Sequence, residues 1–440
     1  MPSAHKILLC LLIPFLSIGL NAHASSASAE VQPPFEFLTL NPETLQGIRK
    51  IPPTNSIRTV SRNERRLLQI LNTLKAGDLI KATRQAQALT QAVPNYALAQ
   101  LLYADLLRLQ KPTTGEWLDP IPLNQHNSHP INEALKADPP PVQAAQLEFS
   151  LRLKALEVAP PPGKIPSHLI SMGNHYRQLV IVDTELGRLY LFNISHPNNR
   201  PRFVLKHSFF ITIGEQGSGK QIEGDKKTPH GIYQLLDRIP QEILPDLYGI
   251  GALNMNYPNP IDRKLGRTGH GIWFHGTPSA TYVRAPLSSD GCVVLSNDDM
   301  QLMLSAATAQ QTLVIIDQGV RWKPTQRLWN PDDIKQHPIH QKLTTLIRDG
   351  MMISNEFTST EFYEGGSKWE YRLLRLVQSN KNIQRSLSFR NITHIDWERD
   401  TPYSMVEFDF QLNSESKVHR VRQYWMNIEG NWKIVRESVL

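Results

Sequence analysis

Residues 285–300 read APLSSDGCVVLSNDDM and contain Cys292, one of only two cysteines in 440 residues. A second stretch, GIWFHGTP at residues 271–278, ends an apolar run on His275. The sequence predicts a strand at GIWFHG and a turn at SSDG that lifts the cysteine out of a sheet. These two stretches indicate a β fold, because the segments around them alternate in the way that strands do.

Alternating apolar residues predict two strands, at residues 178–184 and 188–194, joined by a turn that uses Gly187. Further strands are predicted in the segments KHSFFITIG, HGIYQLLDR and TLVIIDQ, at residues 206–214, 230–238 and 312–318. We therefore expect a mostly β domain over residues 169–321.

The N-terminus has the order of a secretory signal peptide. Lys6 precedes an apolar run over residues 7–20, which ends before an Ala-His-Ala cleavage sequence at residues 22–24. The run is shorter than the roughly 20 residues that span a bilayer. We expect residues 1–24, with Cys10, to be removed and the protein to be exported to the periplasm or cell envelope. In an oxidising compartment the remaining Cys292 is either buried and inert or kept for its reactivity.

The region 25–168 is predicted to be helical and Pro-rich. Ser61 and Glu64 have capping-box spacing, and the helix that they begin stops at Gly77. Asp78 and Asn95 are candidate caps of the next two helices, and a further helix is expected over residues 144–156 between two Pro-rich stretches. The pattern is similar to part of a tetratricopeptide array, and a helical cap on the next domain explains it equally well.

Composition excludes several classes of function. The formal charge of +7 is spread along the chain without a dense basic block, which argues against nucleic acid and suits an anionic polymer. Residues 214–221, GEQGSGKQ, match a nucleotide-binding P-loop except that Gln221 replaces the required Ser or Thr, so no nucleotide is expected. His207, His230 and His270 lack metal-site spacing, and we expect no metal and no cofactor.

A thiol needs a base to act as a nucleophile, and His275 is the candidate base for Cys292. We expect His275 to lower the pKa of this thiol by stabilising the thiolate. Gly291 allows a carbonyl group to approach the backbone, and the N–H groups near Gly291 and Cys292 could bind an oxyanion.

Three ordered motifs, TPHGIY, YPNPIDRKLGRTGHGIWFHGTP and SSDGCVVLS, resemble the exported L,D-transpeptidases with the YkuD-type fold. Their His-Gly element matches His275 and Gly276, and their Ser-x-Gly-Cys element matches Ser289, Gly291 and Cys292. Asp290 and Val294 depart from the residues that many members carry, so Arg267 or Arg284 is the candidate partner of a substrate carboxylate.

The remaining segment, 331–440, has a helical start followed by alternating strands and resembles the nuclear-transport-factor-2-like half-cone. The whole chain is thus expected to be a multidomain α+β protein. For this domain we expect substrate positioning or partner binding, without chemistry of its own.

The resemblance implies an enzyme that acts on peptidoglycan stem tetrapeptides through a cysteine acyl-enzyme. Cys292 is the implied nucleophile and His275 the general base and acid, while Gly276, Ser289 and Gly291 are implied to bind the oxyanion or substrate. The reaction would release D-alanine and form cross-links between two third residues. The alternatives are an L,D-carboxypeptidase that trims tetrapeptide to tripeptide and an inactive wall-binding protein. Envelope proteins are candidate partners of the outer domains.

Overall fold

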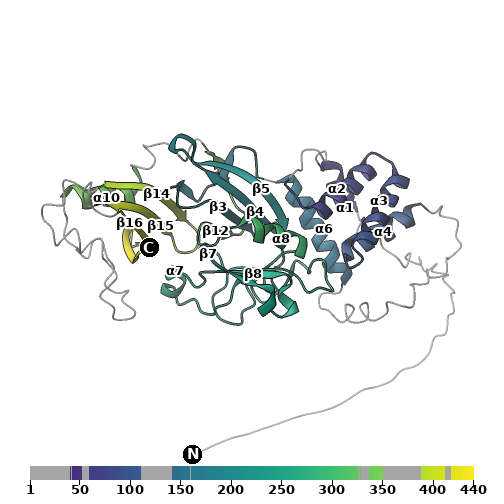
Figure 1. Ribbon diagram of the computed structural model, residues 1–440. Coiled ribbons are helices and arrows are strands. Elements are labelled where there is room, and N and C mark those ends of the chain that lie inside the picture. The colour runs from purple at the N-terminus through teal and green to yellow at the C-terminus, as the bar shows by residue number, and fades with distance from the viewer. Residues whose placement is uncertain are drawn as a thin grey trace, which may run out of the picture. The chain divides into compact units, whose positions relative to one another are not determined.

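The computed structural model describes residues 40, 42–51, 59–110, 141–158, 160–325, 328, 336–349, 388–411 and 418–440 (Figure 1). The predicted signal peptide, residues 1–24, lies outside these ranges. In the part of the chain that is described, no helix combines the length and apolar character needed to cross a membrane.

The first described region is helical, as the sequence predicts. Its helices are α1 (Pro42–Lys50), α2 (Arg62–Lys75), α3 (Leu79–Ala92), α4 (Ala97–Leu109) and α6 (Pro141–Glu157). Their apolar residues form one buried cluster that includes Leu67, Leu71, Ala86 and Leu102. The stripe of leucines and alanines at helical spacing therefore forms the core of this region.

The helix ends show which of the predicted capping residues cap a helix in the structure. Asp78 caps α3, because its carboxylate accepts a hydrogen bond from the Lys81 N–H at 2.9 Å. Ser61 makes no capping hydrogen bond, and Glu64 is buried in ion pairs, so the expected capping box is absent. Asn95 does not cap α4 either, since its amide donates to the Ser279 carbonyl at 3.4 Å. Two of the three predicted caps serve tertiary contacts instead.

The central region contains an eight-stranded mixed sheet with the order β11-β9-β8-β7-β12-β3-β4-β5. Figure 1 labels β3, β4, β5, β7, β8 and β12 of this sheet. Its strands are β3 (Gln178–Asp183), β4 (Arg188–Ser195), β5 (Arg202–Phe210), β7 (Gly231–Pro240), β8 (Gly251–Met255), β9 (Trp273–His275), β11 (Val293–Val294) and β12 (Thr312–Asp317). Two short strands, β6 (Ile213–Gly214) and β10 (Leu287–Ser289), pair separately. Each strand segment that the alternating pattern predicts is present.

Short helices connect these strands. They are α7 (Pro260–Lys264) and α8 (Asn297–Ala306), with 3-10 turns at Pro197–Asn199, Gln241–Ile243 and Asp246–Tyr248. Two residues separate β11 from helix α8, and the side chain of the second, Ser296, caps the helix. Its Met300 and Met303 pack on the sheet.

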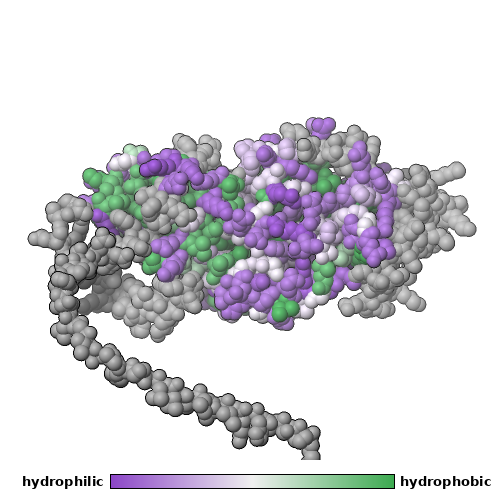
Figure 2. All heavy atoms as spheres, turned by 180° about the vertical axis from the view of Figure 1, so that it is seen from behind, coloured by the Kyte–Doolittle hydropathy of each residue, from purple (hydrophilic) through white to green (hydrophobic). Residues whose placement is uncertain are grey.

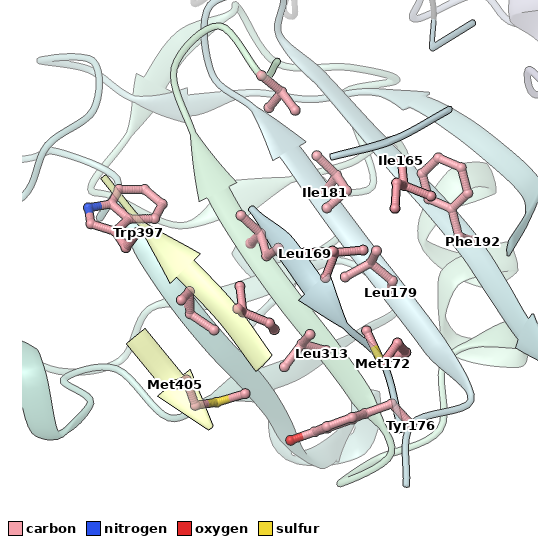
Figure 3. Close-up of a cluster of buried hydrophobic side chains, with 14 of the residues drawn as sticks. Ile165, Leu169, Met172, Tyr176, Leu179, Ile181, Phe192, Leu313, Trp397 and Met405 are labelled. Carbon is pink, nitrogen blue, oxygen red and sulfur yellow. The ribbon is translucent and has the colours of Figure 1, made fainter. Parts of the chain in front are cut away.

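Both faces of the eight-stranded sheet are buried. Leu179 and Ile181 of β3 point to one face, and Val180 and Val182 point to the other, as the two-residue period of a strand requires. The first face packs against residues of the C-terminal sheet, and Figure 3 shows Leu179, Ile181 and Leu313 beside Trp397 and Met405. Seen from behind, hydrophilic residues cover much of the described surface and hydrophobic ones form smaller patches (Figure 2).

The C-terminal region is an antiparallel sheet with one described helix. The helix is α10 (Pro338–Asp349), and the strands are β14 (Ser388–Trp397), β15 (Tyr403–Gln411), β16 (His419–Ile428) and β17 (Asn431–Val439). Ile339 and Leu343 of α10 pack on Phe408 and Trp425 of the sheet. The sheet and helix agree with the predicted α+β character, and the half-cone family assignment stays a prediction.

Strand pairing in the structure crosses the predicted limits of the central domain. Strand β2 (Leu169–Ser171) pairs with β14 and so becomes the fifth strand of the C-terminal sheet. The preceding β1 (Lys164–Pro166) pairs with β13 (Trp322–Pro324). The segment just before the central sheet is therefore shared with the C-terminal sheet, a pairing between residues more than 200 positions apart that no local pattern predicts.

Candidate active site

Strand pairing brings the two candidate catalytic residues to neighbouring strands. Strand β11 runs parallel to β9, with Val293 opposite Phe274 and Val294 opposite His275. Cys292 immediately precedes β11 and therefore lies beside Trp273, two residues before His275. The two motifs, 17 positions apart in the sequence, thus meet at one edge of the sheet.

His275 is held in one tautomer by its own neighbour. Its side chain is buried, and Nδ1 lies 2.7 Å from the Gly276 carbonyl oxygen. A carbonyl oxygen only accepts hydrogen bonds, so Nδ1 carries the proton and Nε2 keeps its lone pair. Burial lowers the pKa of His275 to about 4. The imidazole is therefore neutral at pH 7 and can accept a proton at Nε2.

Cys292 is the one free cysteine among the described residues and is partly exposed. Its Sγ–H donates to the Gly271 carbonyl at 3.4 Å. Burial raises the pKa of the Cys292 thiol, while the Trp273 backbone N–H and the Arg284 guanidinium favour the thiolate. This result differs from the expectation that the thiol pKa is lowered, because desolvation dominates and the adjacent His275 is neutral.

Ser289 and Gly291 shape the turn that carries the cysteine. The Ser289 hydroxyl donates to the Cys292 carbonyl at 2.7 Å and accepts from the Gly291 N–H at 3.2 Å. Gly291 has φ +121°, and a Cβ there would lie 2.7 Å from the Lys227 carbonyl oxygen, so a larger residue does not fit. The Gly291 N–H is thus already bonded and does not serve as the oxyanion donor that the sequence suggested. The Cys292 N–H is the other donor that the sequence suggested.

Gly276 supports His275, and its expected part in binding the oxyanion or substrate stays a prediction. Its carbonyl fixes the His275 tautomer, and its N–H donates to the Tyr248 carbonyl at 3.0 Å. A Cβ at Gly276 would overlap the side-chain oxygen of Asn297. The glycine therefore orients His275 and makes room for Asn297, and its N–H does not face the thiol as a free donor.

Asn297 is a supporting residue that sequence reasoning missed. Its side-chain oxygen accepts from the Thr277 N–H at 3.1 Å, and its amide donates to the Thr277 carbonyl at 2.9 Å. The same oxygen would overlap a Cβ at Gly249. Asn297 thus holds the segment after His275 in place. The only sequence signal was its position at the start of a helix soon after the cysteine motif.

The region that contains this site matches a known protein family. Residues 177–316 match the model of the YkuD L,D-transpeptidase catalytic domain, and this range contains both His275 and Cys292. The region that contains the central sheet therefore matches the family of L,D-transpeptidase catalytic domains. A search of curated proteins gives no match to the chain.

Solved structures with a similar arrangement have low sequence identity. The helical cell shape determining protein Pgp2 from Campylobacter jejuni is 21% identical, with a TM-score of 0.44, and the match covers 61% of this chain and 94% of that one. Bd1075 of Bdellovibrio bacteriovorus is 22% identical, with a TM-score of 0.44 and coverage of 63% and 98%. An L,D-transpeptidase from Mycobacterium smegmatis is 13% identical, with a TM-score of 0.22 and coverage of 32% and 58%.

The glycine-rich loop of the L,D-transpeptidase domain supports the cysteine turn. Thr228 donates to the Gly291 carbonyl at 3.0 Å and accepts from the Gly214 N–H at 3.0 Å. Lys220, which matched the P-loop lysine, is buried and pairs with Asp225 at 2.8 Å. The loop therefore packs behind the cysteine, and its lysine is already paired within the protein.

The two candidate arginines have different surroundings. Arg267 is buried and pairs with Asp262 at 3.0 Å, so it is committed to the fold. Arg284 is half-buried, and its positive charge lowers the pKa of both Cys292 and His275. Arg284 is thus the arginine of the L,D-transpeptidase domain that remains available near the thiol.

The three histidines considered for a metal lie in different settings. His230 and His207 are both half-buried, whereas the His270 side chain is 86% exposed. Among the described residues, the side chains that do lie together are His337, His394 and Asp396 in the C-terminal region. This group was not singled out from the sequence.

The raised thiol pKa predicts a particular pH dependence of labelling. We expect iodoacetamide to react slowly with Cys292 at pH 7 and progressively faster through pH 9, because a thiolate forms only as pH rises above the ordinary range near 8.5. Rates measured from pH 5 to 10 test this, with Cys292→Ala as the background control. His275→Ala should keep the same profile, since neutral His275 does not stabilise the thiolate. A plateau below pH 7 would instead indicate a thiolate–imidazolium pair.

Proposed function

We propose that the protein is a cysteine-dependent peptidoglycan L,D-transpeptidase that forms cross-links between third residues of stem peptides. The observation that carries the proposal is a neutral His275, with Nε2 free to accept a proton, on the strand beside Cys292 in an L,D-transpeptidase domain. Cys292 is the nucleophile, and His275 is the general base and then the general acid.

In the proposed first half-reaction, His275 Nε2 takes the thiol proton as Sγ attacks the carbonyl carbon of the third residue of the donor stem. The oxyanion that forms lies near the Cys292 N–H, the second donor that the sequence suggested. The tetrahedral intermediate collapses, the bond to the terminal D-alanine breaks, and His275 returns the proton to the departing amine. A thioester on Cys292 remains.

In the second half-reaction, an amine of another stem peptide attacks the thioester. His275 takes a proton from this amine, the new amide forms, and the thiol of Cys292 is restored when the proton returns to sulfur. Because the thiol is mostly protonated at rest, proton transfer to His275 has to accompany the attack rather than precede it. Protonated thiol between reactions also limits unwanted alkylation and oxidation.

Arg284 is the residue best suited to attract a substrate carboxylate. Its guanidinium is held near the thiol by a hydrogen bond to the Ser288 carbonyl. Asp290 is exposed beside the cysteine, and its negative charge raises the pKa of both Arg284 and Cys292. This acidic residue can attract the amine of an acceptor stem, while Arg284 faces the donor.

A cavity lies next to the supporting residue Asn297. It has a volume of about 490 Å³, and its lining includes Arg62, Arg66 and Tyr282 as well as Asn297. Two guanidinium groups suit the carboxylates of a stem peptide. In this proposal the helical region forms one wall of the substrate-binding surface, on the side of the segment that follows His275.

Hydrolysis is the second candidate outcome, and the partial exposure of Cys292 favours it. Water that reaches the thioester would release a tripeptide, and the enzyme would then be an L,D-carboxypeptidase. Acylation is identical in the two reactions, so the choice depends on how well the acceptor side excludes water.

Product analysis separates the two outcomes. The full chain is incubated with purified disaccharide tetrapeptide, and the products are resolved by mass. We expect a cross-linked dimer that lacks one D-alanine, at a yield that grows with acceptor concentration. Cys292→Ala is the control and should give neither product. Tripeptide alone, even at high acceptor concentration, would reject transpeptidation in favour of trimming.

Export is part of the proposal, because the substrate is outside the cytoplasm. The signal peptide predicted at residues 1–24 supports it. The stem peptides are the proposed substrate partner, and envelope proteins are the proposed partners of the helical or C-terminal region.

A further inference from the structure

The proposed reaction gives no part to the glycine-rich loop at residues 214–228, whose first half matched most of a P-loop in sequence. In the structure this loop surrounds Thr228. The Thr228 N–H donates to the Gly217 carbonyl at 3.0 Å, and the Thr228 carbonyl accepts from the Gly219 N–H at 2.8 Å. Gly217 and Gly219 have φ of +78° and +87°, a region of backbone conformation that favours glycine. The glycines therefore let the loop wrap around Thr228.

An ion pair inside the loop fixes its shape. Lys220 is buried, and its Nζ lies 2.8 Å from Asp225 Oδ1 and donates to the Ile222 carbonyl at 3.0 Å. The Asp225 carboxylate also accepts from the Ile222 N–H and from the Lys227 N–H, both at 3.1 Å. Lys227 directly precedes Thr228, so the bonds of the loop determine where Thr228 lies.

The Thr228 hydroxyl joins this loop to the cysteine turn. The side chain is fully buried, and Oγ1 accepts from the Gly214 N–H and donates to the Gly291 carbonyl, both at 3.0 Å. A hydroxyl has a single hydrogen to donate, and here Gly291 receives it. Thr228 therefore does not donate to a substrate itself, and any effect on the reaction passes through the turn.

The Gly291 carbonyl and the Cys292 N–H belong to the same peptide group. This group is planar and trans, so its C=O and its N–H point in opposite directions. A bond that holds the Gly291 carbonyl toward Thr228 thus points the Cys292 N–H away from the glycine-rich loop. On the other side of the cysteine, the Ser289 hydroxyl donates to the Cys292 carbonyl at 2.7 Å. Hydrogen bonds therefore fix the backbone on both sides of the Cys292 α-carbon.

We propose that Thr228 is a positioning residue that aims the Cys292 N–H at the oxyanion formed when Sγ attacks a carbonyl group. The proposal rests on the acylation of Cys292 proposed above and adds the residue that orients the oxyanion donor. Such a donor lowers the barrier only if it is held in place before the reaction begins. The glycine-rich loop is the rigid support that holds Thr228 for this purpose.

The test compares two reactions of the same thiol. p-Nitrophenyl acetate acylates Cys292 through an oxyanion: Sγ attacks the acetyl carbonyl, the thiol proton passes to His275, and p-nitrophenolate leaves. Iodoacetamide alkylates Sγ by displacing iodide, and no oxyanion forms. Both rates are measured on the full chain from pH 5 to 10, by release of p-nitrophenol and by intact-protein mass, with Cys292→Ala as the background.

Thr228→Val keeps nearly the same shape and removes the hydroxyl. It should slow acylation by p-nitrophenyl acetate about 10–100-fold, because a misaligned donor stabilises the transition state poorly. Alkylation by iodoacetamide should keep its wild-type rate and pH profile. Thr228→Ser restores the hydroxyl and should restore acylation. The matched control is Thr312→Val in strand β12, which removes an equally buried hydroxyl that donates to the Thr308 carbonyl at 2.8 Å and should leave acylation unchanged.

The proposal fails if Thr228→Val is acylated at the wild-type rate. It also fails if acylation and alkylation fall equally, because the hydroxyl would then only keep the thiol in place. Circular dichroism establishes that each variant is folded. Disaccharide tetrapeptide tests the proposed function separately. A wild-type chain that reacts with p-nitrophenyl acetate but forms no adduct with the tetrapeptide would reject the peptidoglycan substrate, while the comparison of Thr228 variants would still decide the role of Thr228.

Discussion

Cys292→Ala is expected to abolish turnover of disaccharide tetrapeptide, with a loss of at least about 10³-fold in kcat. The sulfur is the only thiol among the described residues, and alanine offers no atom that can form the thioester. Intact-protein mass should show an acyl adduct on the wild-type chain during turnover and none on the variant. The fold should change little, because the side chain is partly exposed and its main contact is the Gly271 carbonyl.

His275→Ala provides the matched comparison for this experiment. It should lower acylation strongly while Cys292 still reacts with iodoacetamide at high pH, because the thiol remains and only the base is lost. His270→Ala removes a histidine from the exposed loop before β9 and should leave activity unchanged. Activity of Cys292→Ala above about one part in a hundred of wild type would reject the nucleophile assignment.

Glu64→Ala is expected to lower the free energy of unfolding by about 3–5 kcal/mol. Glu64 Oε1 accepts from Arg188 at 2.7 Å and lies 3.1 Å from Arg152, and all three side chains are almost fully buried. The carboxylate therefore joins α2 to α6 and to strand β4 of the catalytic sheet. Alanine would leave the Arg188 charge buried without this partner, which costs far more than the lost contact itself.

Chemical denaturation measures this effect. The matched control is Glu185→Ala, which removes a 2.9 Å ion pair with Lys154 in which both side chains are about half exposed. Exposed pairs contribute about 0–1 kcal/mol, so this variant should stay near wild type. Glu64→Gln keeps an acceptor oxygen and should fall between the two. A Glu64→Ala protein within 1 kcal/mol of wild type would contradict a structural role for the buried cluster.

Local patterns predicted the strands well because strand periodicity is a property of consecutive residues. Leu179 and Val180 alternate between two buried faces, and the same alternation recurs in the neighbouring strands. Helix ends were predicted less well. Asp78 caps its helix, but Glu64 and Asn95 form contacts with distant residues that compete with capping.

The catalytic roles of the candidate site residues stay a prediction, and the structure adds the hydrogen bonds around them. The motifs predicted Cys292 and His275, and their parallel strands do lie side by side. The roles of Gly276, Ser289 and Gly291 depend on which N–H groups are already bonded, and these bonds come from the Tyr248 carbonyl and the Ser289 hydroxyl. The thiol pKa depends on burial, which a sequence does not give.

The sequence by itself determined several strands of the central sheet, the helices before it and the spacing of the His-Gly and Ser-x-Gly-Cys motifs. These features follow from neighbouring residues, whose periodicity and turn preferences act over short stretches. Only the tertiary structure decided that Asn297 fits between Gly249 and Gly276, that β2 joins the C-terminal sheet, and that His394 meets His337. Each of these depends on packing between residues far apart in the chain, where shape, burial and competing partners select one arrangement among many.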